Sequence, residues 1–337
     1  MKKYFVLVIL IALFLTACGQ TPKEPASQAS PSPSPKPSEV SPTQVVSEVL
    51  KGVSLSPRSM EAADFTDFFK RAMEVGSVVT WAGDWNELIA DNGGPKVVAG
   101  LAANYGYIPI IELSFHSNGE LIRPLDEAVR QQYKDSAASF AEKYQPAYFG
   151  LGIEVNSVYQ KAAADFETFV GLYNETYTAI KEKSPKTKVF TVFQLEEMKG
   201  YTFWSTGPAD PAKAQWFLLD KFQADIIAFT TYPGLVYKDP SGIPDDYYLE
   251  IASHTSKPVA FTEIGWHSKD SPLGWESSEE EQSRFVERFF ALTRKLDRKI
   301  LIWSFLYDQN TFEPFNSMGL LRGDSTPRPV WNTWIGK

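Results

Sequence analysis

The sequence predicts an α/β protein built as a single (β/α)8 barrel, or TIM barrel. Short apolar stretches alternate eight times with helix-like stretches over the roughly 290 residues that follow residue 45. Alternating strands and helices indicate a parallel sheet, and eight such units in this length suit a closed one. The alternative is a doubly wound open sheet, which normally carries a glycine-rich phosphate loop after an early strand. This sequence has no such loop.

Each expected element follows from its pattern of apolar residues and from the short joints between patterns. The expected strands are 52–56, 77–81, 108–115, 148–154, 188–193, 225–230, 258–263 and 299–305. The expected helices are 61–75, 95–105, 125–144, 166–183, 213–222, 245–254 and 279–296, with a short terminal helix at 329–335.

The first residues form an export signal. Two lysines precede an apolar run that is too short to cross a bilayer as a mature helix, and small residues follow it directly. The segment Leu15-Thr16-Ala17-Cys18 resembles the lipobox of bacterial lipoproteins, which implies a signal peptide at 1–17 and a lipidated Cys18. The alternative for Cys18 is an incidental buried thiol in an uncleaved signal. The resemblance predicts an exported protein, lipid-anchored to the outer face of a cell membrane.

Residues 18–45 are rich in Pro and Ser, and we expect them to form an extended, disordered linker between the anchor and a domain at 46–337. The formal net charge is −8 and no basic tract is present, which argues against a nucleic-acid partner and against electrostatic binding to anionic lipid. Cys18 is the only cysteine, so the fold must depend on burial of its core without an internal disulfide. We expect a monomer that contacts the membrane only through its lipid.

Two of the expected strands end in a glutamate. Glu263 follows the apolar run 258–261, and Glu154 ends the strand that begins at residue 148. In parallel barrels, the C-terminal ends of the strands carry the chemistry. A single strand-end glutamate is more often a helix cap or the partner of a surface lysine, but two such strands together meet the need of glycoside hydrolysis for two carboxyl groups.

With the strands counted, Glu154 ends the fourth and Glu263 the seventh, and the chain then resembles the retaining (β/α)8 glycosidases of clan GH-A. The segments that carry the resemblance are 152–156, Gly-Ile-Glu-Val-Asn, and 262–266, Thr-Glu-Ile-Gly-Trp. They are most similar to those of family 53 endo-β-1,4-galactanases and their relatives. The order and spacing of the whole barrel agree, but only these two segments are specific. The resemblance implies that Glu154 is the acid/base and Glu263 the nucleophile.

The resemblance also implies roles for other residues. Tyr232 follows strand six, where a tyrosine of the clan often hydrogen-bonds the nucleophile, and Trp303 lies on strand eight, where an aromatic forms the floor of the sugar subsite. Their alternatives are a half-buried turn aromatic and a residue that fills the barrel. Ile153 departs from the clan, which usually has an asparagine that binds the sugar hydroxyl next to the reacting carbon. We expect Asn156 or another polar residue to replace it, or else a weakened site.

Tryptophans and histidines at strand ends are further candidates for sugar binding. Indole faces suit the apolar face of a pyranose, and six tryptophans follow or end strands: Trp81, Trp85, Trp204, Trp266, Trp275 and Trp303. We predict that Trp81, Trp204, Trp266 and Trp303 contact substrate, although packing of loops is the alternative for some of the six. His116 after strand three is predicted to bind a hydroxyl, and His267 beside Trp266 is an open alternative; either could be a solvated loop residue.

Other chemistries are disfavoured. The three histidines are dispersed and the cysteine is assigned to lipid, so we expect no metal and no cofactor. A serine nucleophile lacks the Gly-x-Ser-x-Gly elbow. Glu196, Glu197 and Asp84 also follow strands, but such charges more often begin helices or face solvent.

Two classes of function remain. The first is a retaining glycoside hydrolase that acts outside the cell on a β-linked polysaccharide or oligosaccharide. The second is a surface glycan-binding lipoprotein, catalytically weak or inert, on a glycosidase fold.

Overall fold

The computed structural model describes residues 49–205, 207–271 and 274–337. The predicted signal peptide, Cys18 and the linker therefore lie outside the described residues. None of the helices in these ranges is long and apolar enough to cross a membrane.

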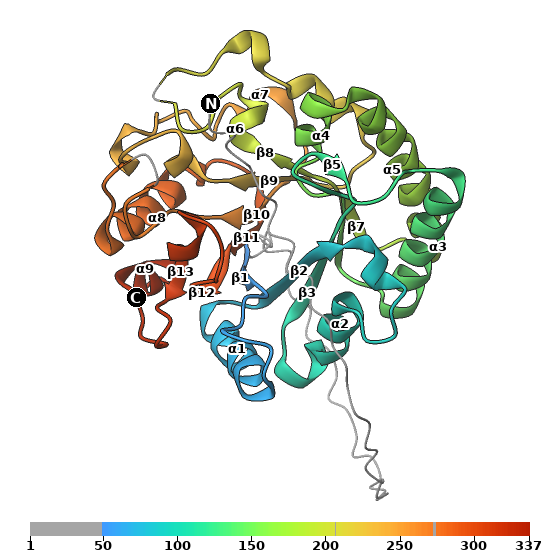
Figure 1. The fold of residues 1–337 in the computed structure, drawn as a ribbon, viewed down its shortest axis with the longest axis horizontal. Coiled ribbons are helices and arrows are strands. Elements are labelled where there is room, and N and C mark those ends of the chain that lie inside the picture. Colours follow the sequence, from blue (N-terminus) through green and yellow to red (C-terminus); the bar gives the residue numbers. More distant parts are fainter. Residues whose placement is uncertain (1–48, 206, 272–273) are drawn as a thin grey trace, which may run out of the picture.

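The described chain is a parallel barrel of strands surrounded by helices, which confirms the predicted fold class (Figure 1). The barrel strands are β1 (Leu50–Ser54), β2 (Val78–Asp84), β3 (Ile108–Ser114), β6 (Tyr148–Leu151), β7 (Lys188–Phe190), β8 (Val192–Gln194), β9 (Ile227–Thr231), β10 (Val259–Ile264) and β11 (Arg298–Trp303). Two small pairs lie outside it: β4 (His116–Ser117) with β5 (Glu120–Leu121), and β12 (Phe305–Tyr307) with β13 (Gly319–Leu321).

The barrel closes through a fifth strand that is split in two. β7 pairs with β6, and β8 pairs with β9, while β7 and β8 are separated only by Thr191. The remaining pairs run β6, β3, β2, β1, β11, β10, β9, all parallel. The eight predicted strands are therefore present in order, with one of them interrupted.

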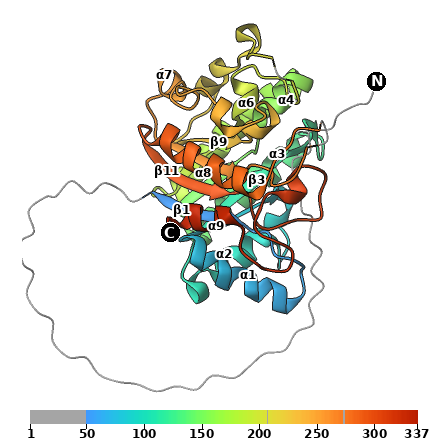
Figure 2. The same ribbon diagram turned by 90° about the vertical axis from the view of Figure 1, so that its left-hand side faces the viewer.

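Helices cover the outside of the barrel. They are α1 (Ala62–Val75), α2 (Gly94–Tyr105), α3 (Glu127–Tyr144), α4 (Val155–Lys161), α5 (Ala163–Lys183), α6 (Leu195–Met198), α7 (Ile251–His254), α8 (Glu279–Thr293) and α9 (Pro329–Ile335). The two views show α8 and α9 side by side against one side of the barrel (Figure 2). α4, which begins directly after Glu154, was not expected from the sequence.

The predicted helices 213–222 and 245–254 are wrong in extent. The first is a 3-10 helix, η3 (Trp216–Lys221), and the second is only α7 preceded by turns. In the turn before α7, the consecutive residues Tyr247 and Tyr248 are both fully buried. Consecutive positions do not share one face of an α-helix, so burying both side chains is better served by turns.

Side chains alternate between the lumen of the barrel and the layer under the helices, as the period of a strand requires. The lumen is filled by apolar side chains: Val78, Ile110, Phe190, Val192, Ile226, Ala228, Ala260, Ile300 and Ile302. A larger cluster, which includes Val79, Phe261 and Trp303, lies between the sheet and the helices. This alternation decides which strand residues can reach a site at the mouth.

A buried arginine ties the end of the chain to the barrel. Arg328, whose side chain is 2% exposed, donates to both carboxylate oxygens of Asp308 at 2.8 and 2.6 Å and to Glu279 at 3.2 Å. It also donates to the carbonyls of Gly319 and Leu321. One guanidinium thus joins the β12–β13 pair to α8 just before α9.

We predict that Asp308→Ala lowers the free energy of unfolding by about 3 kcal/mol, because it leaves the buried guanidinium without its bidentate partner. Asp245→Ala is the control, since the Asp245 side chain is 91% exposed and its 2.7 Å ion pair with Arg288 should contribute less than about 1 kcal/mol. Urea denaturation of both variants measures the difference. Equal losses would contradict this role of Arg328.

Candidate active site

A strained turn after β6 presents Glu154. Gly152 has a φ of 96° and Glu154 a φ of 49°, both in the left-handed region. A Cβ at Gly152 would lie 2.6 Å from Val155 Cγ1 and 2.9 Å from Phe169, so a larger residue does not fit. Glycine adopts such a φ at little cost, whereas a glutamate pays about 1–2 kcal/mol for it. The strain at Glu154 is the kind that clusters at functional sites.

Glu154 occupies the N-cap position of α4, but its side chain does not cap the helix. It is 7% exposed, and its Oε1 accepts a hydrogen bond from the Thr230 hydroxyl at 2.7 Å. Burial and then repulsion from Glu263 raise the pKa of Glu154 well above its ordinary value. Although the hydrogen bond from Thr230 lowers this pKa, burial and the charge of Glu263 favour the protonated form of Glu154.

Glu263 lies near the end of β10, where the pairing with β9 shifts register between Phe261 and Glu263. One of its oxygens accepts a hydrogen bond from the Tyr232 hydroxyl, which also lies 2.9 Å from Ser304 Oγ. Burial raises the pKa of Glu263, and the hydrogen bond from Tyr232 lowers it. The phenol thus stabilises the ionised form of Glu263.

The structure brings the two predicted carboxyl groups together across the mouth of the barrel. Thr230 is the β9 residue that pairs with Glu263, and the same Thr230 donates to Glu154. The charge of Glu263 raises the pKa of Glu154, and both glutamates raise the pKa of Tyr232. Two carboxyl groups of unequal proton affinity therefore share one site, which is the arrangement that divides acid and base roles.

The other acids proposed from the sequence have different surroundings. Glu196 is fully buried and accepts hydrogen bonds from Thr231 Oγ1 at 2.8 Å, the Tyr247 hydroxyl at 2.9 Å and the backbone N–H of Tyr232 at 3.2 Å. It holds the segment that carries Tyr232. Asp84 forms a 2.6 Å ion pair with Arg123.

A third carboxyl group lies inside the barrel. Glu112 on β3 is fully buried, and among the described residues only Thr262 comes close enough to lower its pKa, without meeting the geometry of a full hydrogen bond. Gly150, its neighbour on β6, leaves the space, since a Cβ there would lie 2.9 Å from Glu112 Cγ. Burial and then the charge of Glu263 raise the pKa of Glu112 well above its ordinary value. Sequence analysis missed this residue, although its parity with Ile110 places it in the lumen.

Two predicted sugar contacts are instead tied to the backbone. His116 is fully buried, its Nε2 lies 2.6 Å from the Ile153 carbonyl and its Nδ1 accepts from Gly119 N–H at 3.2 Å. Burial lowers the pKa of His116 to about 4, so the ring is neutral and donates to Ile153, the residue before Glu154. This corrects the prediction of a hydroxyl-binding histidine: His116 holds the turn that presents Glu154.

Asn156 is also fully buried, and its amide joins α4 to β8. Its Oδ1 accepts from Gln194 N–H at 2.8 Å, and its Nδ2 donates to the Gln194 carbonyl at 3.1 Å and to Gln215 at 3.0 Å. Both amide hydrogens are used within the protein and the side chain is fully buried, so it has no donor to offer a substrate hydroxyl. Asn156 therefore does not replace the asparagine for which Ile153 stands, which corrects that expectation.

Three of the predicted tryptophan platforms are buried away from the mouth. Trp303 is fully buried under the helices, 5.6 Å from the ring of Trp334, and donates to the Met318 carbonyl at 2.7 Å. Its neighbour Ser304 takes the inward position beside Tyr232. Trp266 is fully buried against Phe285. These positions do not fit sugar platforms, because no face of either indole is open.

Trp81, on β2, is 4% exposed and packs in the outer layer close to Gly83 and Gly94. Because the indole is buried, Trp81 is not the sugar platform that the sequence predicted. Trp85 is fully buried and Trp275 is 6% exposed.

Trp204 is the predicted tryptophan that remains partly exposed. It packs against an apolar cluster around Tyr232 and lies at an angle to Trp275 with ring centroids 6.1 Å apart. The buried members of that cluster are Tyr232, Leu235, Phe305, Phe315 and Met318, and Phe203, Trp204 and Phe312 pack on them. The apolar wall beside Glu263 is thus built largely of phenylalanines that sequence analysis did not select.

His267, the open alternative, is fully buried, and neither ring nitrogen has a partner within the described ranges. Burial lowers its pKa to about 4, so it is a neutral ring. In the part of the chain that the structure describes, no group of three His, Cys, Asp or Glu side chains could hold a metal ion.

The sequence matches no protein-family model and no curated protein. Solved structures, however, share its fold. A GH5_18 protein from Streptomyces cattleya, solved with GlcNAc, has a TM-score of 0.64 at 14% identity over 86% of this chain and 79% of that one. The GH53 catalytic domain from Ignisphaera aggregans has a TM-score of 0.58 at 15% identity over 88% of this chain and 99% of that one.

The exo-β-1,4-mannosidase Op5Man5 from an Opitutaceae bacterium has a TM-score of 0.61 at 13% identity over 86% of this chain, which spans 58% of the mannosidase. The fold is therefore that of the (β/α)8 glycoside hydrolases of clan GH-A, as the sequence resemblance implied. A family 53 domain, the family with the most similar motifs, is among these structural neighbours.

We predict that Glu112→Gln stabilises the protein progressively as pH rises above the ordinary glutamate pKa of 4.5. Glu112 binds its proton more tightly in the folded state than in the unfolded state, because burial raises its pKa. Rising pH therefore favours the unfolded wild type, whereas glutamine does not titrate. Denaturant midpoints at pH 4.5 and pH 8 measure the difference.

Glu175→Gln is the control, because the Glu175 side chain is 61% exposed and its replacement should change stability by under about 0.5 kcal/mol at either pH. A gap between Glu112→Gln and wild type that is the same at both pH values would show that Glu112 is ionised in the fold.

Proposed function

We propose that this protein is a retaining glycoside hydrolase that acts on a β-linked polysaccharide or oligosaccharide, with Glu263 as nucleophile and Glu154 as acid/base. The observation that carries the proposal is the unequal environment of the pair. Tyr232 donates to Glu263 and favours its ionised form, while burial and the charge of Glu263 favour the protonated form of Glu154. One carboxylate ready to attack and one acid ready to donate are what the first step of double displacement requires.

In that step, Glu154 donates its proton to the glycosidic oxygen as the bond to the anomeric carbon breaks. Glu263 attacks that carbon and forms a glycosyl ester. Glu154, now a carboxylate, takes a proton from water, which attacks the anomeric carbon and releases Glu263. Two inversions give net retention.

Neighbouring hydroxyl groups orient both acids without neutralising them. Thr230 holds one oxygen of Glu154, so the other can carry the proton. Ser304 lies 2.9 Å from the Tyr232 hydroxyl and donates to the Ile264 carbonyl at 3.1 Å, which fixes the phenol that orients Glu263.

The second candidate is a glycan-binding protein without turnover. Ile153 favours it, because its apolar side chain is 1% exposed at the position where clan members carry an asparagine. Loss of that hydrogen bond removes part of the transition-state stabilisation that glycosidases draw from the 2-hydroxyl group.

The location is also a proposal. The Leu15-Thr16-Ala17-Cys18 segment supports an exported protein, lipid-anchored at Cys18 to the outer face of a cell membrane, with a linker that gives the barrel access to external glycans.

We predict that Glu263→Ala abolishes, and Glu154→Ala strongly reduces, release of reducing ends from whichever of β-galactan, β-mannan and β-glucan the wild type cleaves. Azide should rescue Glu263→Ala and give an inverted α-glycosyl azide. Glu154→Ala should lose about 10²–10⁴-fold on the glycan, yet still form the intermediate from an activated aryl β-glycoside. Azide should then give the retained β-product.

Glu142→Ala is the control, since its side chain is 58% exposed on α3 and it should keep wild-type turnover. Wild-type activity in both glutamate variants would overturn the assignment. Tight glycan binding by the wild type without any released reducing end would favour the second candidate.

We predict that Cys18→Ser releases the protein from the membrane fraction, because serine cannot take the lipid. Fractionation of cells that express each form, with labelled palmitate, measures both anchoring and lipidation. A variant that stays in the membrane fraction would contradict the lipobox assignment.

A further inference from the structure

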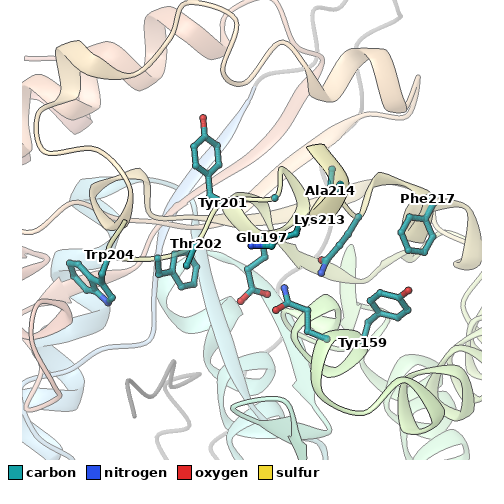
Figure 3. A pocket seen from close by; sticks show the side chains of 13 residues that line it. Tyr159, Glu197, Tyr201, Thr202, Trp204, Lys213, Ala214 and Phe217 are labelled. Atoms are coloured by element: carbon teal, nitrogen blue, oxygen red, sulfur yellow. The ribbon is translucent and has the colours of Figure 1, made fainter. Parts of the chain in front are cut away.

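A cavity of about 780 Å³ opens beside the acid/base, and neither Glu154 nor Glu263 lines it. It lies between α4 and the segment that follows β8 (Figure 3). Its size falls within the range of about 300–1,000 Å³ that is usual for small-molecule sites. None of the residues that line it belongs to β1, β2 or β3.

Glu197 connects this cavity to the candidate active site. Ser157 on α4, three positions after Glu154, donates to Glu197 Oε2 at 3.0 Å, and the charge of Glu197 contributes to the raised pKa of Glu154. A general acid must stand next to the leaving oxygen. The part of the cavity between α4 and Glu197 therefore lies next to the acid/base, where the leaving group is received, and Trp204 extends the cavity toward the wall beside Glu263.

Aromatic side chains stand at both ends of the cavity. Figure 3 shows Trp204 at one end and Tyr159 and Phe217 at the other, with Glu197 between them. The rings of Tyr159 and Phe217 meet edge to face, 5.6 Å apart. Phe217 is 52% exposed, and with Ile89 it is one of two large apolar side chains so exposed among the described residues. The Phe217 ring is therefore accessible at the rim of the cavity.

The polar groups between these rings suit hydroxyl groups. The Glu197 carboxyl group reaches into the cavity (Figure 3), and burial raises its pKa to about 7. The charged groups around it are Lys161, Glu196 and Glu154, and Lys213 also lines the cavity. Aromatic faces with a few convergent polar groups are the combination that binds a pyranose, whose faces are apolar and whose edges carry hydroxyls.

We propose that this cavity binds the leaving-group arm of a β-linked oligosaccharide, with Trp204 and the Tyr159–Phe217 pair as platforms for successive sugars and Glu197 accepting from a hydroxyl group between them. The inference rests on the proposed function and adds to it that the substrate is a chain with at least two sugars beyond the scissile bond.

The test measures affinity against chain length in a Glu263→Gln background, which removes the nucleophile. Calorimetry with β-1,4-linked gluco-, manno- and galacto-oligosaccharides of two to five sugars should show affinity rising with length for one of the series. For the longer chains, Phe217→Ala should lower the affinity about fivefold, and Glu197→Gln should lower it about tenfold. Ile89→Ala is the matched control: Ile89 is 40% exposed, does not line the cavity, and should change nothing.

Product analysis with reducing-end-labelled pentasaccharide gives a second readout in the active enzyme. The leaving group carries the reducing end, so the wild type should release long labelled fragments, and Phe217→Ala should shift the products to shorter ones. The melting temperature of Phe217→Ala should stay within a few degrees of wild type, because the ring is half exposed.

Each outcome decides between the two proposals. If the wild type cleaves a glycan but both variants bind every length as the background does, the cavity is not the subsite and the proposed hydrolase stands. If the protein neither binds nor cleaves any of the three series, both proposals fail. Length-dependent binding lost in Phe217→Ala and Glu197→Gln but kept in Ile89→Ala supports the subsite.

Discussion

Hydroxyl groups hold the carboxyl groups at the mouth of this barrel. The pKa values of both acids depend on the fact that these donors are neutral. Thr230 donates to Glu154, and Tyr232 donates to Glu263. A cation in either place would lower the pKa of its carboxyl group and ionise it. With neutral donors, burial raises both pKa values, and the charge of Glu263 raises the pKa of Glu154 further.

Three buried polar side chains hold the backbone around these acids in place. His116 donates to the carbonyl before Glu154, Asn156 joins α4 to β8, and Glu196 holds the segment of Tyr232. Each of these side chains is buried with its hydrogen bonds made, which is the condition under which a buried polar group adds rigidity. They secure a turn whose backbone is strained at Glu154.

The sequence predicted the barrel well because alternation of strand and helix is encoded by local periodicity along the whole chain. It also predicted which strands end in the two glutamates and in Tyr232. The prediction that Trp303 and Trp81 contact sugar was wrong. Side chains alternate along a strand, and each tryptophan points to the same side as Leu301 or Val79, which face the helices. The hydrogen bonds that bury Asn156 and His116 are made with partners far away in the sequence, which no local pattern reveals.

The split fifth strand lies between the strands that carry the two acids. Glu154 follows β6 on one side of the break, and Glu263 lies on β10 on the other. Across the break itself, a backbone bond from Val192 to Gly152 and the side chains of Asn156 and Thr230 join the two sides. The ladder that runs from β6 through β1 to β9 joins them around the rest of the barrel. On this side of the barrel a backbone bond and a few side chains, and no strand pairing among the described residues, join the turn of Glu154 to the strands next to it. Point substitutions there can therefore shift Glu154 relative to Glu263 while the other strands keep their pairing.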